Sequence, residues 1–239
     1  MSLRRAALPL LLLLAVLLGA LTACSSSGGG SGSKQETAAQ LLARSKKTLD
    51  NAKSLHFVLT SSNVPSATSG LTGGEGDIAR PASFRGTLKV IAAGATVDVK
   101  VVSVKGKVYA QLPFTSGYSV VDPAQFGISD PAALLDPNTG ISQLLTQVNA
   151  PKLGGEKRVG GEVVQEVTGT IPGDQVQKLL GDKNPGKPVD VSFLIAPDSG
   201  QLRRATLTGP FFTAGSDTTY TLDLSRYGED VTITAPATG

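Results

Sequence analysis

The sequence has one cysteine, one histidine and no tryptophan, and each shortage excludes a class of site. A single cysteine cannot close an internal disulfide, so an exported fold must be held together by packing alone. One histidine excludes a multi-histidine metal centre and leaves at most one imidazole for acid–base catalysis. The sequence also contains no G-x-S-x-G elbow, no P-loop and no strand-linked G-x-G-x-x-G motif. These absences predict a protein that is not an enzyme and has no cofactor or metal, in which His56 is structural or lies on the surface.

Charge gives no support for a polyanionic partner. The 22 Lys and Arg against 19 Asp and Glu give a formal net charge of +3. Arg4 and Arg5 lie within residues 1–23, and without that segment the balance is 20 against 19, a net charge of +1. Nucleic-acid-binding domains concentrate a clear excess of Lys and Arg. Nucleic acid is therefore not an expected partner.

Residues 1–23 are typical of a secretory signal. Arg4 and Arg5 form a basic head, and residues 8–21 are almost unbroken apolar sequence. These 14 residues fall short of the roughly 20 that span a bilayer as a helix. We therefore expect export across the membrane rather than a transmembrane anchor.

Residues 21–24, Leu-Thr-Ala-Cys, resemble the bacterial lipobox. The resemblance implies cleavage before Cys24, a diacylglyceryl group on its sulfur, and acylation of its new amino group. Two or three acyl chains exceed the single-chain threshold for stable anchoring. The alternative is an ordinary secretory cut that leaves Cys24 idle. The lipobox predicts a protein held by lipid at the extracytoplasmic face of the cell membrane.

Composition divides the rest of the chain into a tether and one domain. Residues 24–36 carry the lipidated Cys24 and a Gly/Ser run, which cannot bury enough apolar area to fold. Residues 37–239 have the size of a single domain. Aromatic residues make up only 5% of the chain, while Val, Thr and Ile favour strands. The aliphatic interior suits either a packed core or a cavity for flexible chains.

Periodicity predicts mainly antiparallel strands joined by short turns. Strands are expected at residues 55–60, 77–93, 97–104, 108–112, 152–159, 163–171, 189–195, 202–208, 220–225 and 231–235, with a loop at 65–76. Helical spacing predicts helices at residues 37–53 and 173–181. A phase slip at residues 102–104 indicates a bulge or burial on both faces.

Residues 122–148, which we call the lid, interrupt the strands. Asp122, Asp130 and Asp136 each stand before a proline, the pattern of a capping acid before the first helical position. The lid is therefore predicted to contain short helices at residues 123–126, 131–135 and 139–148. Helices are the available cover for the apolar face of an antiparallel sheet.

Several segments in order resemble the mycobacterial LppX/LprA/LprF/LprG cell-envelope lipoprotein family, and its LprG branch most of all. They are Leu55-His56-Phe57-Val58-Leu59-Thr60, Gly106-Lys107-Val108-Tyr109-Ala110, Asp122-Pro123-Ala124-Gln125, Leu135-Asp136-Pro137-Asn138-Thr139-Gly140, residues 161–171, and Leu224-Ser225-Arg226-Tyr227-Gly228-Glu229. The loops at residues 70–76 and 210–217 depart from the family.

The resemblance implies an α+β fold and a lipid ligand. The fold would be a strongly curved antiparallel half-barrel, similar to the LolA/LolB carriers, with helices over its concave face. The cavity between them would hold acyl chains of triacylglycerol or acylated glycolipids, and a membrane lipid exporter would be a partner. The apolar faces of the strands and lid suggest the lining: Phe57, Leu59, Val99, Val101, Leu112, Leu134, Leu145, Phe193, Ile195, Leu222 and Leu224.

Three functions stay open at the level of sequence. The first is a monomeric, membrane-anchored carrier that binds an acylated lipid or glycolipid and moves it across the cell envelope. The second is a structural or partner-binding lipoprotein whose helices complete a solid core. The third is an enzyme acting on envelope lipids, for which the sequence supplies no nucleophile with an adjacent base. A cavity, or its absence, separates the first function from the second.

Overall fold

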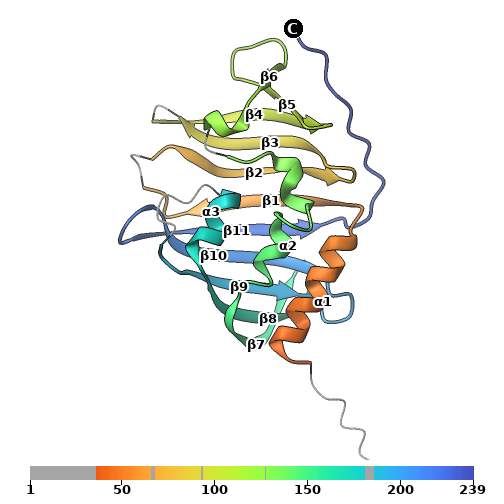
Figure 1. Cartoon of the computed structure of the whole chain (residues 1–239), viewed down its shortest axis with the longest axis vertical. Coiled ribbons are helices and arrows are strands. Elements are labelled where there is room, and N and C mark those ends of the chain that lie inside the picture. Colours follow the sequence, from red (N-terminus) through yellow and green to blue (C-terminus); the bar gives the residue numbers. More distant parts are fainter. Residues whose placement is uncertain (1–35, 66–67, 93, 127, 181–185) are drawn as a thin grey trace, which may run out of the picture. The chain divides into compact units, whose positions relative to one another are not determined.

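A long antiparallel sheet dominates the computed structural model, which describes residues 36–65, 68–92, 94–126, 128–180 and 186–239. The expected signal peptide, Cys24 and all of the tether except Glu36 lie outside the described residues. The described strands form one 11-stranded sheet in the order β6-β5-β4-β3-β2-β1-β11-β10-β9-β8-β7 (Figure 1). Their bounds are β1 Ser54–Ser62, β2 Gly70–Ala79, β3 Ser83–Ala92, β4 Ala95–Val104, β5 Lys107–Gln111, β6 Ser119–Val121, β7 Asn149–Val159, β8 Glu162–Ile171, β9 Val189–Ile195, β10 Leu202–Thr213 and β11 Ser216–Ser225.

The strand order explains why the lid exists. The chain starts at the centre of the sheet with β1, proceeds strand by strand to the β6 edge, then reappears at the β7 edge and returns to β11 beside β1. The connection between the two edges must therefore cross a face of the sheet. That connection is the lid, whose described helices are η1 Pro123–Phe126, η2 Pro131–Leu135 and α2 Ile141–Leu144. Covering the apolar face is thus built into the topology.

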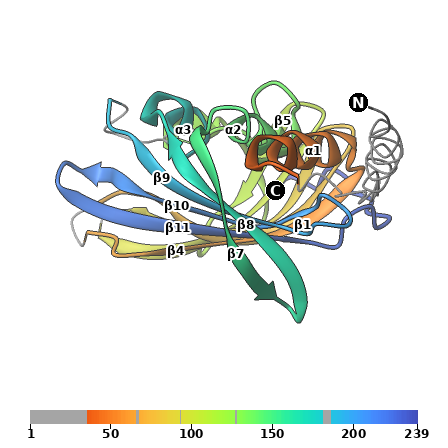
Figure 2. The same ribbon diagram turned by 90° about the horizontal axis from the view of Figure 1, so that it is seen from below.

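All described helices lie on the same face of a curved, open sheet, as Figure 2 shows. The fold class is therefore the predicted one, a half-barrel with helices over its concave face. Besides the lid helices, these are α1 Ala38–Asn51 and α3 Gly173–Leu180. Helix α1 begins with a capping box, in which the Thr37 side chain accepts from the Gln40 backbone and the Gln40 side chain accepts from Thr37. Its stripe of Leu41, Leu42 and Leu49 is buried against the sheet.

Most predicted elements are confirmed. The helix predicted at residues 37–53 is α1, and the short helices at 123–126 and 131–135 match η1 and η2 to the residue, as 3-10 helices. The turn between β4 and β5 uses Lys105 and Gly106, with φ of 53° and 72°. The phase slip in β4 reflects burial on both faces, because Val101 and Val102 are both buried while the pairing with β3 is unbroken.

Glycine misled the sequence prediction at residues 65–76, where a loop was expected and β2 begins at Gly70. Gly76 pairs with Gly86 of β3, and a Cβ on Gly86 would lie 2.1 Å from the Glu75 carbonyl oxygen. Phe84 also lies within 2.8 Å of where Cβ atoms on Gly76 and Gly86 would stand. These glycines make room for a buried ring that stacks on Phe57 at 5.7 Å. They therefore serve side-chain packing inside a strand rather than loop flexibility.

The lid and the C-terminus depart from prediction in two further places. The helix expected at residues 139–148 is shorter, because α2 spans only Ile141–Leu144. The strand expected at 231–235 joins no described ladder. Instead, the C-terminal segment runs up the right-hand side of the sheet in Figure 1. It is held at its start, where Gly228 donates to the Ser54 carbonyl oxygen at 2.9 Å, and near its end, where Thr238 bridges Tyr118.

The two edges of the sheet are irregular. Strand β7 is almost entirely exposed, and its register with β8 shifts between Asn149 and Lys152 and again between Leu153 and Glu156. Strand β6, which was not predicted, has only three residues. Between the edges, one hydrophobic cluster runs the length of the sheet, from the α1 leucines to the β4 and β5 valines. Among the described residues, no helix is long and apolar enough to cross a membrane.

Candidate functional site

An apolar cavity of about 360 Å³ lies between the sheet and the lid. Its floor comes from β10, β11, β1, β2 and β3, and its roof from the lid and α3. The lining residues are Phe57, Leu59, Leu71, Leu88, Ile128, Ser129, Asp130, Pro131, Ala133, Leu134, Thr139, Ile141, Leu144, Leu179, Leu207, Tyr220 and Leu222. All but four of these side chains are apolar, so the cavity offers shape and area rather than polar handles.

Tyr220 contributes a ring rather than a polar group to the floor. Its hydroxyl donates to the Leu71 carbonyl oxygen at 2.6 Å, which satisfies the hydroxyl as a donor within the sheet. Phe211 meets the ring edge-on, with the centroids 5.1 Å apart, and holds it in place. The aromatic face next to Leu222 is therefore a fixed apolar part of the cavity wall.

Asp130 ties the start of η2 to the sheet. One carboxylate oxygen accepts from the backbone N–H of Ala132 at 2.9 Å, which caps the helix. The other accepts from the hydroxyl of Ser103 at 2.9 Å. Ser103 is fully buried on β4, so this bond joins the lid directly to the sheet. The one carboxylate in the cavity wall is thus occupied in holding the roof.

Arg80 ties down the other end of η2. Its guanidinium donates to the carbonyl oxygens of Leu135, at 2.5 Å, and Ala52, at 2.9 Å. One side chain at the end of β2 therefore connects the end of η2 to the end of α1. Helix η2 is fixed at both ends by polar bonds, while the residues between them line the cavity.

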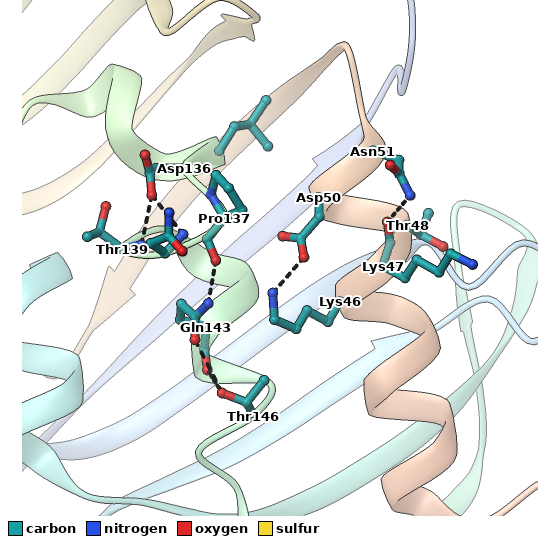
Figure 3. Close-up of polar contacts among 12 residues, drawn as sticks. Lys46, Lys47, Thr48, Asp50, Asn51, Asp136, Pro137, Thr139, Gln143 and Thr146 are labelled. Atoms are coloured by element: carbon teal, nitrogen blue, oxygen red, sulfur yellow. Dashed lines mark hydrogen bonds and ion pairs between the residues drawn. The ribbon is translucent and has the colours of Figure 1, made fainter.

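A second polar cluster orders the turn between η2 and α2, as Figure 3 shows. The Asp136 carboxylate accepts from the backbone N–H groups of Asn138, at 2.7 Å, and Thr139, at 3.0 Å. The bond from Asn138 is the largest cause that lowers the pKa of Asp136 below its ordinary value. The Gln143 side chain donates to the Pro137 carbonyl oxygen from the following helix. These bonds stabilise the lid from within, without filling the space beneath it.

A smaller cavity of about 120 Å³ adjoins the first towards the β6 edge. Its lining is entirely apolar: Leu88, Val90, Val97, Val99, Val101, Val108, Ala110, Leu112, Val121, Pro123, Ile128 and Pro131. Leu88, Ile128 and Pro131 line both cavities. One residue of the floor and two of the lid therefore form the partition between them.

The structure distributes the predicted lining residues over three places. Phe57, Leu59, Leu134 and Leu222 line the larger cavity, and Val99, Val101 and Leu112 line the smaller one. Leu145, Phe193, Ile195 and Leu224 are buried in the core but belong to the lining of neither cavity. Phe193, Ile195 and Leu224 face inward as the alternation predicted, and Leu145 is a buried lid residue, but side chains fill the space around all four.

Sequence reasoning missed several lining residues. Leu71 lies in the stretch predicted as a loop, and Leu207 and Tyr220 lie on predicted strands with the correct inward phase. Asp130 was expected only to cap a helix, although it also bonds Ser103. The alternation of β10 and β11 could have found Leu207 and Tyr220, whereas nothing local indicates the bond to Ser103.

The single histidine takes no part in the cavity. Phe57 faces the cavity, so the neighbouring His56 side chain lies on the opposite face of the strand. There its Nδ1 is 2.8 Å from the Asp77 carboxylate, which also accepts from Arg226 at 2.9 Å. Within the described ranges, no group of three or more His, Cys, Asp or Glu is placed to hold a metal ion.

Comparisons with known proteins agree with one another. The model of the LppX_LprAFG lipoprotein family matches residues 37–233. The chain is 31% identical over 209 residues to the lipoarabinomannan carrier protein LprG of Mycolicibacterium smegmatis, covering 83% of each chain. It is 29% identical over 187 residues to the protein of the same name in Mycobacterium tuberculosis, covering 77% of this chain and 75% of that one. The crystal structure of LprF from Mycobacterium bovis has the same fold, with a TM-score of 0.72 at 23% identity over 84% of this chain and 97% of that one.

Proposed function

This chain belongs to the LppX_LprAFG lipoprotein family, and from that premise we propose that it is a lipid carrier of the cell envelope. It binds an acylated lipid or glycolipid with the acyl chain in the apolar cavity. A lipid anchor on Cys24 holds it at the extracytoplasmic face of the cell membrane. From there it carries its ligand across the envelope.

The observation that carries this proposal is the cavity of about 360 Å³ with its largely apolar lining. Its volume corresponds to about twelve water molecules at liquid density, which fits a length of one alkyl chain. Each methylene buried there gains about 0.8 kcal/mol. The smaller cavity, beyond the partition of Leu88, Ile128 and Pro131, offers further apolar volume next to the larger one. A ligand held this way is selected by its hydrocarbon rather than by polar contacts.

The alternative, a structural or partner-binding lipoprotein with a solid core, is less well supported. A solid core would bring the lid side chains into contact with the floor at native packing density. The gap over Leu59 and Leu222 does not fit that expectation. The name of the LprG relatives, lipoarabinomannan carrier protein, supports a carrier and favours an acylated glycolipid as the ligand.

Loading and release require the lid to move, because η2 and α2 lie over the cavity. Few polar bonds hold η2 to the sheet, chiefly those of Asp130 with Ser103 and of Arg80 with Leu135. Breaking a few hydrogen bonds of about 1 kcal/mol each costs far less than unfolding the sheet. We propose that the lid opens as a unit when these two attachments break. Opening takes place beside a membrane exporter that supplies the ligand.

Extraction of the native protein tests the carrier function. Protein purified from its own envelope is treated with organic solvent, and the extract is examined by mass spectrometry. We expect acylated lipids at close to one per protein molecule, and fewer from a Leu59→Trp variant in which the floor is filled. If the correctly folded protein yields no stoichiometric lipid, the carrier function is contradicted. The structural or partner-binding alternative with a solid core would then be favoured.

The anchor and the domain division are tested separately. We propose that residues 1–23 are removed as a signal peptide, that residues 24–36 form the lipidated tether, and that residues 37–239 are the single lipid-binding domain. A Cys24→Ala protein should pass from the membrane fraction into the medium, whereas the parent protein stays with the membrane. Retention of the variant would place the anchor elsewhere without affecting the carrier function.

We further propose that the protein is a monomer without catalytic activity. The cavity contains one carboxylate, Asp130, which is already bonded to Ser103 and Ala132. The imidazole of His56 lies on the far face of β1, where it cannot reach a ligand in the cavity. Incubation with acylated glycolipids should return them chemically unchanged, and release of free fatty acid would overturn this point.

A further inference from the structure

The hairpin between β5 and β6 carries an exposed apolar patch. Among the described residues, four large hydrophobic side chains are exposed, and Leu112, Phe114 and Val120 of this hairpin are three of them. Phe114 is completely exposed, at 107%, with Val120 at 60% and Leu112 at 42%. We call Leu112, Phe114 and Val120 the tip. An apolar cluster that no part of the domain covers marks a contact site.

The backbone holds Phe114 outward at a position that favours glycine. Residues Leu112 to Thr115 form a tight turn, in which the Thr115 N–H donates to the Leu112 carbonyl oxygen at 3.2 Å. Pro113 occupies the second position, and Phe114 at the third has φ of 68°. A turn of this type prefers glycine or asparagine there, because a side chain at positive φ is strained. The ring thus adds strain to the domain without adding buried contacts to it.

The composition of the hairpin fits a lipid surface rather than a protein. Residues 111–121 contain no charged side chain, although they include Phe114 and Tyr118. Aromatic and aliphatic side chains on a protruding turn enter the interfacial layer of a bilayer readily. A partner protein would need about 800 Å² on each side for a stable complex, far more than three side chains provide.

The tip borders the smaller cavity. Leu112 is exposed at the tip and also lines the smaller cavity, together with Val121 of β6. Leu88, Ile128 and Pro131 separate the smaller cavity from the larger one. An acyl chain that enters at the tip therefore meets only apolar side chains, and it reaches the larger cavity when this partition moves.

The tip and the entry of the chain lie at opposite ends of the sheet. Residues 1–35 join the domain at Glu36, immediately before α1, which packs beside the β7 edge (Figure 1). The tip lies at the β6 edge, ten strand spacings away, or about 48 Å along the sheet. Twelve residues of a Gly/Ser-rich linker have a mean end-to-end distance of about 20 Å. An anchor near Cys24 therefore favours a tip that faces away from the anchoring membrane.

We propose that the tip is a docking element for a second lipid bilayer, opposite the one that holds the anchor. Phe114 enters the outer layer of that bilayer, and Leu112 lies between the tip and the smaller cavity. This inference rests on the proposed function for its purpose, which is delivery of the acyl ligand. The docking itself needs no ligand, so the two proposals can fail independently.

The absence of tryptophan makes a direct test possible. The full chain carrying Phe114→Trp is reconstituted in donor vesicles and mixed with acceptor vesicles whose phospholipid acyl chains are brominated. We expect acceptor lipids to quench the tryptophan severalfold and to shift its emission to the blue. The matched control is Leu153→Trp, which probes the fourth exposed hydrophobic side chain, on β7, and should not respond to acceptor lipids. No quenching of Phe114→Trp, or quenching by brominated donor lipids alone, would overturn the proposal.

A second variant removes the ring without harming the fold. Phe114→Gly suits the positive φ of the turn, so its melting temperature should equal or exceed that of the parent protein. Cross-linking of donor to acceptor vesicles should fall severalfold, while the amount of co-purified lipid stays unchanged. Unchanged vesicle cross-linking would contradict the tip as the docking element. Quenching by acceptor lipids in protein that never co-purifies with lipid would instead count against the carrier function alone.

Discussion

The two halves of the concave face are covered in different ways. Over β7 to β9, the cover is α1, a continuous helix of 14 residues whose leucine stripe is buried, and β9 contributes the fully buried Phe193 and Ile195. The rest of the sheet runs from β10 through β11 and β1 to the β6 edge. Its cover consists mainly of the lid and α3, whose helices have four to eight residues each. The first half is filled, and the second half contains both cavities.

The difference shows how a fold can leave space without losing order. A long amphipathic helix presents a side chain to the sheet at nearly every turn and packs into it. The lid must cross most of the sheet between its two edges, and Pro123, Pro131 and Pro137 interrupt it at short intervals. Its segments are fixed through polar bonds at their ends instead, as Asp130 and Arg80 illustrate. Polar attachment at the ends of the helices therefore adds to the packing of buried lid residues such as Leu135, Ile141 and Leu144.

Matched leucine truncations should separate the two halves most clearly. Leu49, on α1 over the filled half, is buried, while Leu222 lines the larger cavity. Leu49→Ala should lower the free energy of unfolding by about 4 kcal/mol, and Leu222→Ala by about 2 kcal/mol, because a residue next to a void loses fewer contacts. Urea denaturation measures both values. Equal losses would mean that the two halves are packed alike.

Adding volume should also be tolerated better beside a cavity than in the filled half. Val167→Trp, in the filled half, should cost about 1–3 kcal/mol through overpacking. Val99→Trp, in the smaller cavity, should leave stability within about 1 kcal/mol of the parent protein because the ring enters existing space. Lipid co-purification should fall only for Val99→Trp. A strongly destabilised Val99→Trp protein would favour the solid-core alternative.

Removing polar bonds from the lid and, separately, from α1 should show which of the two controls exchange of the ligand. Asp136→Ala removes the bonds to Asn138 and Thr139 in the lid, and Thr37→Ala removes the capping bond of α1. Each should cost about 1 kcal/mol. Only Asp136→Ala should speed exchange of a fluorescent fatty acid out of the cavity. If Thr37→Ala has the same effect, the lid is not the part that opens.

Acid should have the smallest effect, and it should act on the lid. The pKa of Asp136 is lowered in the folded state, so its contribution is present above the ordinary aspartate pKa and is lost as the pH falls through the folded value. Fatty-acid exchange should therefore quicken below about pH 4. Asp136→Asn keeps an accepting oxygen but cannot titrate, so its exchange rate should no longer depend on this group. An identical pH profile in that variant would assign the acid response to another carboxyl.

Local sequence signals predicted elements well and their packing less well. The Asp-Pro steps placed η1 and η2 to the residue, because a capping acid before proline acts within a few residues. Alternation correctly turned Phe57, Val99 and Phe193 inward. It could not distinguish Phe57, which lines a cavity, from Phe193, which lies in the filled core. That distinction depends on which helix crosses above, and hence on contacts between distant parts of the chain.

The errors of the sequence prediction share the same origin. Residues 70–76 resembled a loop although they form a strand in which Gly76 makes room for Phe84, and Val231 and Ile233 resembled a strand although the segment continues past the sheet. Val231 and Ile233 alternate correctly, but Thr238 meets Tyr118 at the far end instead. In both cases a partner distant in sequence decides the conformation.

The irregular edge of β7 limits edge-to-edge association between neighbouring copies of the protein. Proteins confined to a membrane surface meet one another at high local concentration, and an open sheet exposes unpaired backbone groups along its margins. The double register shift of β7 and its Lys152, Lys157 and Arg158 side chains disfavour strand addition from a neighbour. The β7 edge thus disfavours fibril formation even where many copies stand side by side.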